Sequence, residues 1–217
     1  MDFGFLTKYY GMYLTGARNT LLLAFFTVLL GVFFGVALAL MRLSKNPILK
    51  GFAASYIEFI RGTPLLVQLL IIYYGLPHLT GMRFPDLFAG IVALTFNSAA
   101  YIAEIIRAGI MSVDKGQMEA ARSLGMPHSM AMKHIIIPQA FKNILPALGN
   151  EFIVVIKESA IVSIIGISDI MRTATIVRGN TYRPFEPLIV AAVMYFMITF
   201  TLSNLMRMME RRLRASD

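Results

Sequence analysis

Five long apolar stretches constrain the fold of this chain more than any other feature. A helix of about 20 apolar residues, rising about 1.5 Å per residue, crosses the roughly 30 Å hydrocarbon core of a membrane. Only 15% of the 217 residues are charged, against about 25% in a typical soluble protein. The sequence therefore predicts one all-α membrane domain, residues 1–217, and argues against a soluble enzyme. The expected spans cover residues 21–41, 52–76, 87–111, 148–166 and 188–206.

The basic residues predict how these spans are oriented. Lys and Arg concentrate on the cytoplasmic side of membrane proteins. Twelve of the 20 flank the spans on one side, and six lie on the other side. We therefore expect a multi-pass protein with its N-terminus outside and its C-terminus in the cytoplasm. The twelve are Arg42, Lys45, Lys50, Arg107, Lys115, Arg122, Lys133, Lys142, Arg207, Arg211, Arg212 and Arg214.

The sequence lacks the residues and motifs that several kinds of functional site require. There is no Cys, so disulfides and thiolate metal sites are excluded. The three His are scattered, and no G-x-x-x-x-G-K-[ST] motif is present, so we expect neither a metal site nor a bound nucleotide or other cofactor in this chain. The net charge of +8 arises mostly from residues that flank apolar spans. We therefore expect no nucleic-acid partner.

Residues 112–147, between the third and fourth spans, form the most informative segment. It is far longer than the about 2–8 residues that usually connect helices in a bundle. Asp114 and Gln117 resemble a capping box, which predicts a short helix over residues 115–124 that ends at Gly125. This helix is amphipathic, with small residues at its centre. It would either dock into a groove of a partner or lie on the lipid surface.

Three prolines predict the rest of this segment. Pro127 suits the first turn of a second short helix that reaches toward Ile137. Pro138 and Pro146 are expected to interrupt the chain before the fourth span, because proline removes a helical hydrogen bond.

The segment also contains a spaced motif. Gly follows an EAA triplet by four residues, Ile follows that Gly by ten, and an Ile-Pro pair closes the pattern. This pattern resembles the EAA loop of bacterial ABC importer permeases, with Ile137 replacing the usual Leu. Residues 58–64, 103–109 and 159–166 resemble the polar amino acid uptake branch of that family, closest to its arginine, histidine and glutamine members. The residues that match the loop or cap it are Asp114, Glu119, Ala120, Ala121, Gly125, Ile135, Ile137 and Pro138.

The resemblance implies a fold, a location and partners. It implies a type I ABC importer permease in the bacterial plasma (inner) membrane, with five transmembrane helices and short cytoplasmic coupling helices. ATP and Mg would bind to two copies of a separate ATPase subunit, and Asp114, Glu119, Ala120, Ala121, Gly125 and Pro138 would belong to the joint with it. A second permease, either another copy or a relative in a heterodimer, would complete the membrane part. An extracytoplasmic amino-acid-binding protein would deliver the substrate.

Polar residues at membrane depth indicate a substrate path, because charge in a bilayer is costly and is usually functional or paired. In the fourth span, Glu151 and Glu158 share one helical face, and Lys157 and Ser159 lie beside Glu158 near the middle of the span. Helix-to-helix polar contacts are the alternative for this cluster.

The second and third spans supply further candidates. Asn97 and Tyr101 lie one turn apart in the third span, and Glu58 and Arg61 lie close to one face of the second span, with Thr63 two residues further on. The alternative is structural, because Glu58 and Arg61 have the spacing of an intrahelical ion pair. Glu104 and Arg107 have the same spacing, and Tyr101 alone would suit bundle packing.

Four acids and three bases inside the spans leave a slight acidic excess. This excess predicts a cationic L-amino acid, namely arginine, histidine or lysine, carried by alternating access. A glutamine or glutamate permease is the alternative. A stand-alone carrier is less consistent with the chain, because carriers usually contain internal repeats and none is visible here. A membrane anchor without transport would leave the charges of the fourth span without a role.

Overall fold

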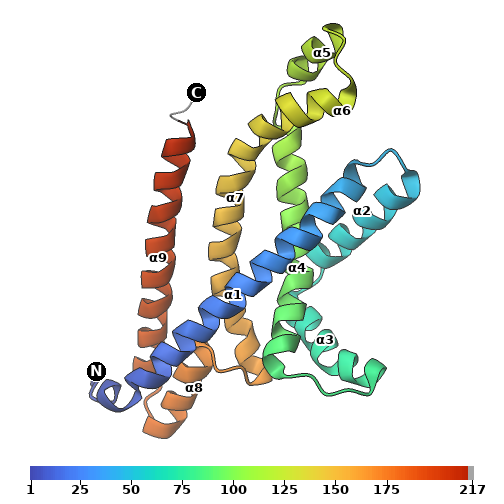
Figure 1. Ribbon diagram of the computed structural model, residues 1–217. Coiled ribbons are helices and arrows are strands. Elements are labelled where there is room, and N and C mark those ends of the chain that lie inside the picture. The colour runs from blue at the N-terminus through green and yellow to red at the C-terminus, as the bar shows by residue number, and fades with distance from the viewer. Residues whose placement is uncertain (215–217) are drawn as a thin grey trace.

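The computed structural model describes residues 1–214, and these form helices joined by short connections (Figure 1). The α-helices are α1 (Leu6–Leu43), α2 (Pro47–Gly62), α3 (Leu65–Thr80), α4 (Asp86–Met111), α5 (Lys115–Ser123), α6 (His128–Ala131), α7 (Ile137–Glu158), α8 (Ile170–Thr181) and α9 (Glu186–Arg214). A π-helical turn, Met132–Ile136, joins α6 to α7, and a 3₁₀ segment, Ser159–Ile165, follows α7.

The helices connect two ends of an elongated bundle. Figure 1 shows α5, α6, the turn between α1 and α2, and the C-terminal end of α9 at one end. The N-terminus, α8 and the loop between α3 and α4 lie at the opposite end. We call the first the coupling end and the second the outer end, after the role and the side that the sequence predicts for them. The segments for which the sequence predicted the cytoplasmic side therefore lie together.

Small residues allow α1 and α4 to pack closely. A Cβ atom added to Gly35 would lie 2.7 Å from Ile102 Cγ2 and 3.1 Å from the carbonyl oxygen of Ala99. A Cβ added to Gly31 would lie 3.1 Å from the hydroxyl of Ser98. Small residues at helix contacts are the usual basis of close packing in membrane proteins. These glycines place α1 directly against the polar part of α4.

The expected span over residues 52–76 is not one continuous helix. It is divided between α2 and α3, whose axes differ by 108°. Pro64 has no N–H for the helical hydrogen bond, and the preceding residue, Thr63, has an extended backbone with φ −117° and ψ 147°. The two helices together are long and apolar enough for one broken span, whereas α1, α4 and α9 each satisfy the same criterion alone.

The expected interruption at Pro138 and Pro146 is wrong. The helical path continues from α6 through the π turn into α7, and Pro146 lies inside α7. Pro138 occupies the first turn of α7, where the missing N–H costs little. The polar residues of α7 keep it below the simple apolar criterion, but α7 runs beside α4 between the two ends of the bundle (Figure 1). The expected span 148–166 is the second half of α7 with the 3₁₀ segment.

Candidate functional site

The coupling end contains a short helical hairpin built by local capping. Asp114 accepts a hydrogen bond from the backbone N–H of Gly116 at 2.7 Å and begins α5, as predicted. Gly125 has φ +84°, which glycine adopts without a steric penalty, and the N–H of Met126 donates to the carbonyl of Ala121 at 3.1 Å. The predicted helix and its glycine stop are therefore confirmed. The Gln117 side chain accepts instead from Gln139 at 3.4 Å, so the reciprocal half of a capping box is not formed.

The hairpin has one buried and one exposed face. Ala121 is only 2% exposed and Ala131 is fully buried, and they lie on the two arms of the hairpin. Glu119 and Ala120 are exposed, as is Leu124, at 84%. Pro138 is exposed where α7 begins. Within the EAA triplet, therefore, the second Ala packs the hairpin, while Glu119 and Ala120 are available to a partner.

The four candidates of the fourth span do not form one cluster. Glu151 is 8% exposed and accepts a hydrogen bond from the hydroxyl of Ser98 on α4 at 3.3 Å. Ser159 is fully buried, and its hydroxyl donates to the carbonyl of Ile156 at 2.8 Å. Lys157 and Glu158 are exposed, and neither forms an ion pair within the described part of the chain.

Thr63 and Asn97 belong to a hydrogen-bond network at the bend between α2 and α3. Gln68 donates to the carbonyl of Ile60 at 2.7 Å and to the hydroxyl of Thr63 at 2.8 Å. Asn97 donates to the side-chain oxygen of Gln68 at 2.9 Å. Gln68 is buried and caps the carbonyl groups that the bend leaves without helical partners. The network joins α2, α3 and α4, and its central residue was not among the predicted site residues.

The expected ion pair between Glu58 and Arg61 is wrong. Glu58 pairs with Arg42 of α1 at 3.8 Å, and the guanidinium of Arg61 lies 5.5 Å from the centre of the Tyr101 ring on α4. The other expected pair is confirmed, because Arg107 Nε donates to Glu104 Oε2 at 2.9 Å. The charges of α2 are thus used to join it to α1 and α4.

Asp169 was missed by the sequence analysis. It is fully buried, and its carboxylate accepts from the N–H of Arg172 at 2.7 Å and from the hydroxyl of Tyr195 on α9 at 3.2 Å. The next N–H, that of Ile170, donates to the hydroxyl of Thr20 on α1 at 3.3 Å. An Asp just before a helical stretch is a signal for a helix N-cap, and this one also joins α1, α8 and α9.

No group of three or more His, Asp or Glu residues in the described chain could hold a metal ion.

The family described as binding-protein-dependent transport system inner membrane component matches residues 27–215. The chain belongs to this family. The resemblance of this chain to ABC importer permeases, which the EAA loop indicated, is therefore confirmed.

Two relatives and one solved structure are similar over nearly the full length. A Rickettsia bellii permease protein named for glutamine transport, GlnP, is 47% identical over 93% of this chain and 92% of its own. The arginine transport system permease protein ArtQ of Bacillus subtilis is 44% identical over 94% and 93%. A crystal structure of an amino acid ABC transporter with histidines is 57% identical, covers 98% of this chain and 99% of its own, and has a TM-score of 0.94. The predicted all-α permease fold is confirmed.

Proposed function

We propose that the chain is the permease subunit of an ATP-driven importer that moves a polar, cationic L-amino acid into the cell by alternating access. The observation that carries the proposal is Glu158, an exposed carboxylate at the C-terminal end of α7 that has no ion pair within the described chain. Lys157 is its neighbour, but adjacent residues on a helix point about 100° apart. A cationic substrate would supply the missing counter-charge during passage.

The other polar candidates have supporting positions in this proposal. Glu151 lies two turns before Glu158 on α7, where the Ser98 hydroxyl holds it against α4. Asn97 lies one residue before Ser98 and is fixed by Gln68 at the bend of the second span. These groups are buried between α3, α4 and α7, so in this proposal they support the helices behind the path, while Glu158 is exposed to the substrate. The relative named for arginine transport and the structure with histidines support a cationic substrate.

A glutamine permease is the second candidate. The relative named for glutamine transport is 47% identical, slightly more than the relative named for arginine. A neutral amino acid would bind through its ammonium and carboxylate groups alone, so it would depend less on Glu158. The two candidates therefore predict different responses when this carboxylate is neutralised.

The proposal includes the orientation and the partners. The exposed Glu119, Ala120 and Leu124 at the coupling end would contact one of two ATPase subunits, where ATP and Mg bind, in the cytoplasm. The N-terminus would lie outside with the binding protein. A second permease, most simply another copy, would line the other side of the path, because an exposed charge at membrane depth needs protein or water beside it.

Neutralising two matched carboxylates tests the substrate. Glu158→Gln should raise the half-saturating concentration of L-arginine about 10–150-fold in ATP-driven uptake, since a charge-assisted hydrogen bond contributes about 1.5–3 kcal/mol. Glu58→Gln is the control. The sequence made Glu58 a candidate, but its pairing with Arg42 supports a structural role in joining α2 to α1, and it is an exposed carboxylate like Glu158. Equal arginine affinity in both variants would contradict the assigned role. Unchanged uptake of glutamine with no arginine uptake in the unmodified protein would favour the second candidate.

A further inference from the structure

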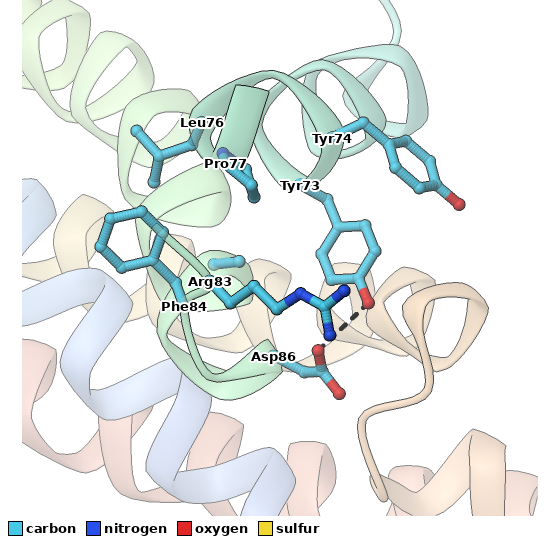
Figure 2. A pocket seen from close by; sticks show the side chains of 8 residues that line it. Tyr73, Tyr74, Leu76, Pro77, Arg83, Phe84 and Asp86 are labelled. Carbon is cyan, nitrogen blue, oxygen red and sulfur yellow. Dashed lines mark hydrogen bonds between the residues drawn. The ribbon is translucent and has the colours of Figure 1, made fainter. Parts of the chain in front are cut away.

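A pocket at the outer end is not used by the proposed path. Its volume is about 480 Å³, within the range of roughly 300–1,000 Å³ of small-molecule sites. It lies between the second half of α3 and the loop that leads into α4, at the end opposite α5 (Figures 1 and 2). The side chains with polar or aromatic groups in its lining are Tyr73, Tyr74, Arg83, Phe84 and Asp86.

An acidic and a basic group face this one cavity. Tyr73 donates its hydroxyl proton to Asp86 Oδ1 at 3.1 Å, which fixes the carboxylate at the pocket wall. Figure 2 shows the guanidinium of Arg83 reaching into the same space beside Tyr73 and Asp86. In the described part of the chain, Arg83 forms no ion pair, with Asp86 or any other residue. The two opposite charges thus stay available to a ligand.

Aromatic rings surround these charges. The rings of Tyr73 and Tyr74 meet edge to face, with centroids 5.1 Å apart, and Phe84 stacks on Phe88 at 5.4 Å. Aromatic faces attract organic cations such as guanidinium and ammonium. A ligand that fits all of these groups has a carboxylate, an ammonium group and a cationic or apolar side chain.

We propose that this pocket is an outer binding site for the transported L-amino acid, occupied before the substrate reaches α7. Arg83 pairs with the α-carboxylate through its planar guanidinium, and Asp86 accepts hydrogen bonds from the α-ammonium group. Tyr74 and Phe84 contact the side chain. The inference rests on the proposed function, since it takes an amino acid as the substrate and the outer end as its side of origin.

The absence of Trp from the sequence gives a direct test. Tyr74→Trp introduces a single Trp at the pocket, and Phe185→Trp introduces a single Trp at a position with the same native exposure, 67%, in the turn between α8 and α9. The purified full chain in lipid nanodiscs is titrated with L-arginine. We expect a saturable change in emission from the first variant and none from the second.

Two further variants and one analogue test the assigned contacts. In the Tyr74→Trp background, Asp86→Asn and Arg83→Gln should each raise the half-saturating arginine concentration about tenfold. Agmatine, which is arginine without its carboxylate, should bind about tenfold more weakly than arginine to the Tyr74→Trp protein. Arg83→Gln should remove that preference, an effect that a merely structural role of Arg83 would not produce.

The outcomes separate this proposal from the proposed function. A Trp signal that does not respond to arginine, in a protein that still imports arginine, would overturn the outer site and leave the transport function intact. A signal that depends on protein concentration and not on arginine would assign the pocket to a contact between two copies and also overturn it. A specific arginine signal from a complex that imports no amino acid would support the pocket and contradict the transport function.

Discussion

The coupling end and the polar middle of the bundle are built in different ways. The hairpin of α5 and α6 depends on contacts within about a dozen residues, such as the Asp114 cap and the turn at Gly125. The polar middle depends on contacts between distant segments, such as Asn97 with Gln68 and Ser98 with Glu151. Sequence spacing therefore describes the first region well and the second poorly. The same difference predicts that substitutions in the first affect transport, and those in the second affect folding.

The largest effect is expected at Gly125. Its φ of +84° disfavours side chains by about 1–2 kcal/mol, although a Cβ there would meet no atom within 4 Å. Gly125→Val should therefore reduce the population of the native turn, and with it ATP-driven uptake, roughly 5–30-fold. Thermal stability of the purified permease should be nearly unchanged.

Gly125→Asn is the matched control, because Asn tolerates a positive φ far better than Val. It should retain most of the uptake. Equal uptake by the Gly125→Val and Gly125→Asn variants would contradict the proposed difference between the two regions. Unfolding of the Gly125→Val protein would contradict it as well.

An intermediate effect is expected at Gln68. Gln68→Leu leaves the carbonyl of Ile60 and the amide of Asn97 buried without their partner. The free energy of unfolding should fall by about 1–3 kcal/mol, or about 2–4 °C in Tm for each kcal/mol in a chain of this size. Thermal unfolding in detergent measures this change.

Gln117→Leu is the control for Gln68, since Gln117 is exposed on α5. It should leave Tm unchanged. A Gln68→Leu protein with normal Tm but weakened arginine affinity would show that the network belongs to the substrate path and not to the scaffold.

The smallest effect is expected at the outer end, where Arg183 pairs with Asp2 and closes the N-terminal segment against the turn between α8 and α9. The hydrogen bond from Arg183, and then that from the N–H of Gly4, lowers the pKa of Asp2 from 3.8 to about 2. A lowered folded-state pKa contributes stability above the unfolded pKa and loses it as the pH falls through the folded one.

Asp2→Asn should therefore lower Tm slightly at pH 7, and the difference from the unmodified protein should disappear between about pH 4 and pH 2. Because both side chains are exposed in part, we expect a small change. A difference in Tm that persists unchanged at pH 2 would contradict the pairing.

The coupling hairpin was predictable because its determinants are local. A cap, a glycine stop and a fixed motif spacing define its helix boundaries to within a residue or two. The position of a proline alone did not predict whether a helix is interrupted there. Pro64 breaks a stretch whose hydropathy suggested one continuous span, whereas Pro146 lies inside a helix that the sequence predicted to be interrupted. The difference is tertiary: Gln68 stabilises the first break, and packing against α4 and α9 maintains the second helix.

Side-chain partners in the membrane were predictable only where they lie on one helix. The pair of Glu104 with Arg107 follows from its spacing. Glu58 has a basic residue at the same spacing, yet it pairs with Arg42, because α1 and α2 are folded against each other. Likewise, the 3.3 Å contact between Ser98 and Glu151 depends on the close packing of α4 and α7, which no local pattern encodes.

Uptake by the reconstituted transporter tests the central claim most directly. The chain is inserted into proteoliposomes with its ATPase and binding protein, and radiolabelled L-arginine is supplied on the side of the binding protein. We expect uptake that requires ATP on the opposite side, that histidine and lysine inhibit, and that Gly125→Val reduces roughly 5–30-fold without loss of the assembled protein. Arginine uptake that proceeds without ATP, or ATP-driven uptake that accepts glutamine and excludes arginine, would contradict the proposed function.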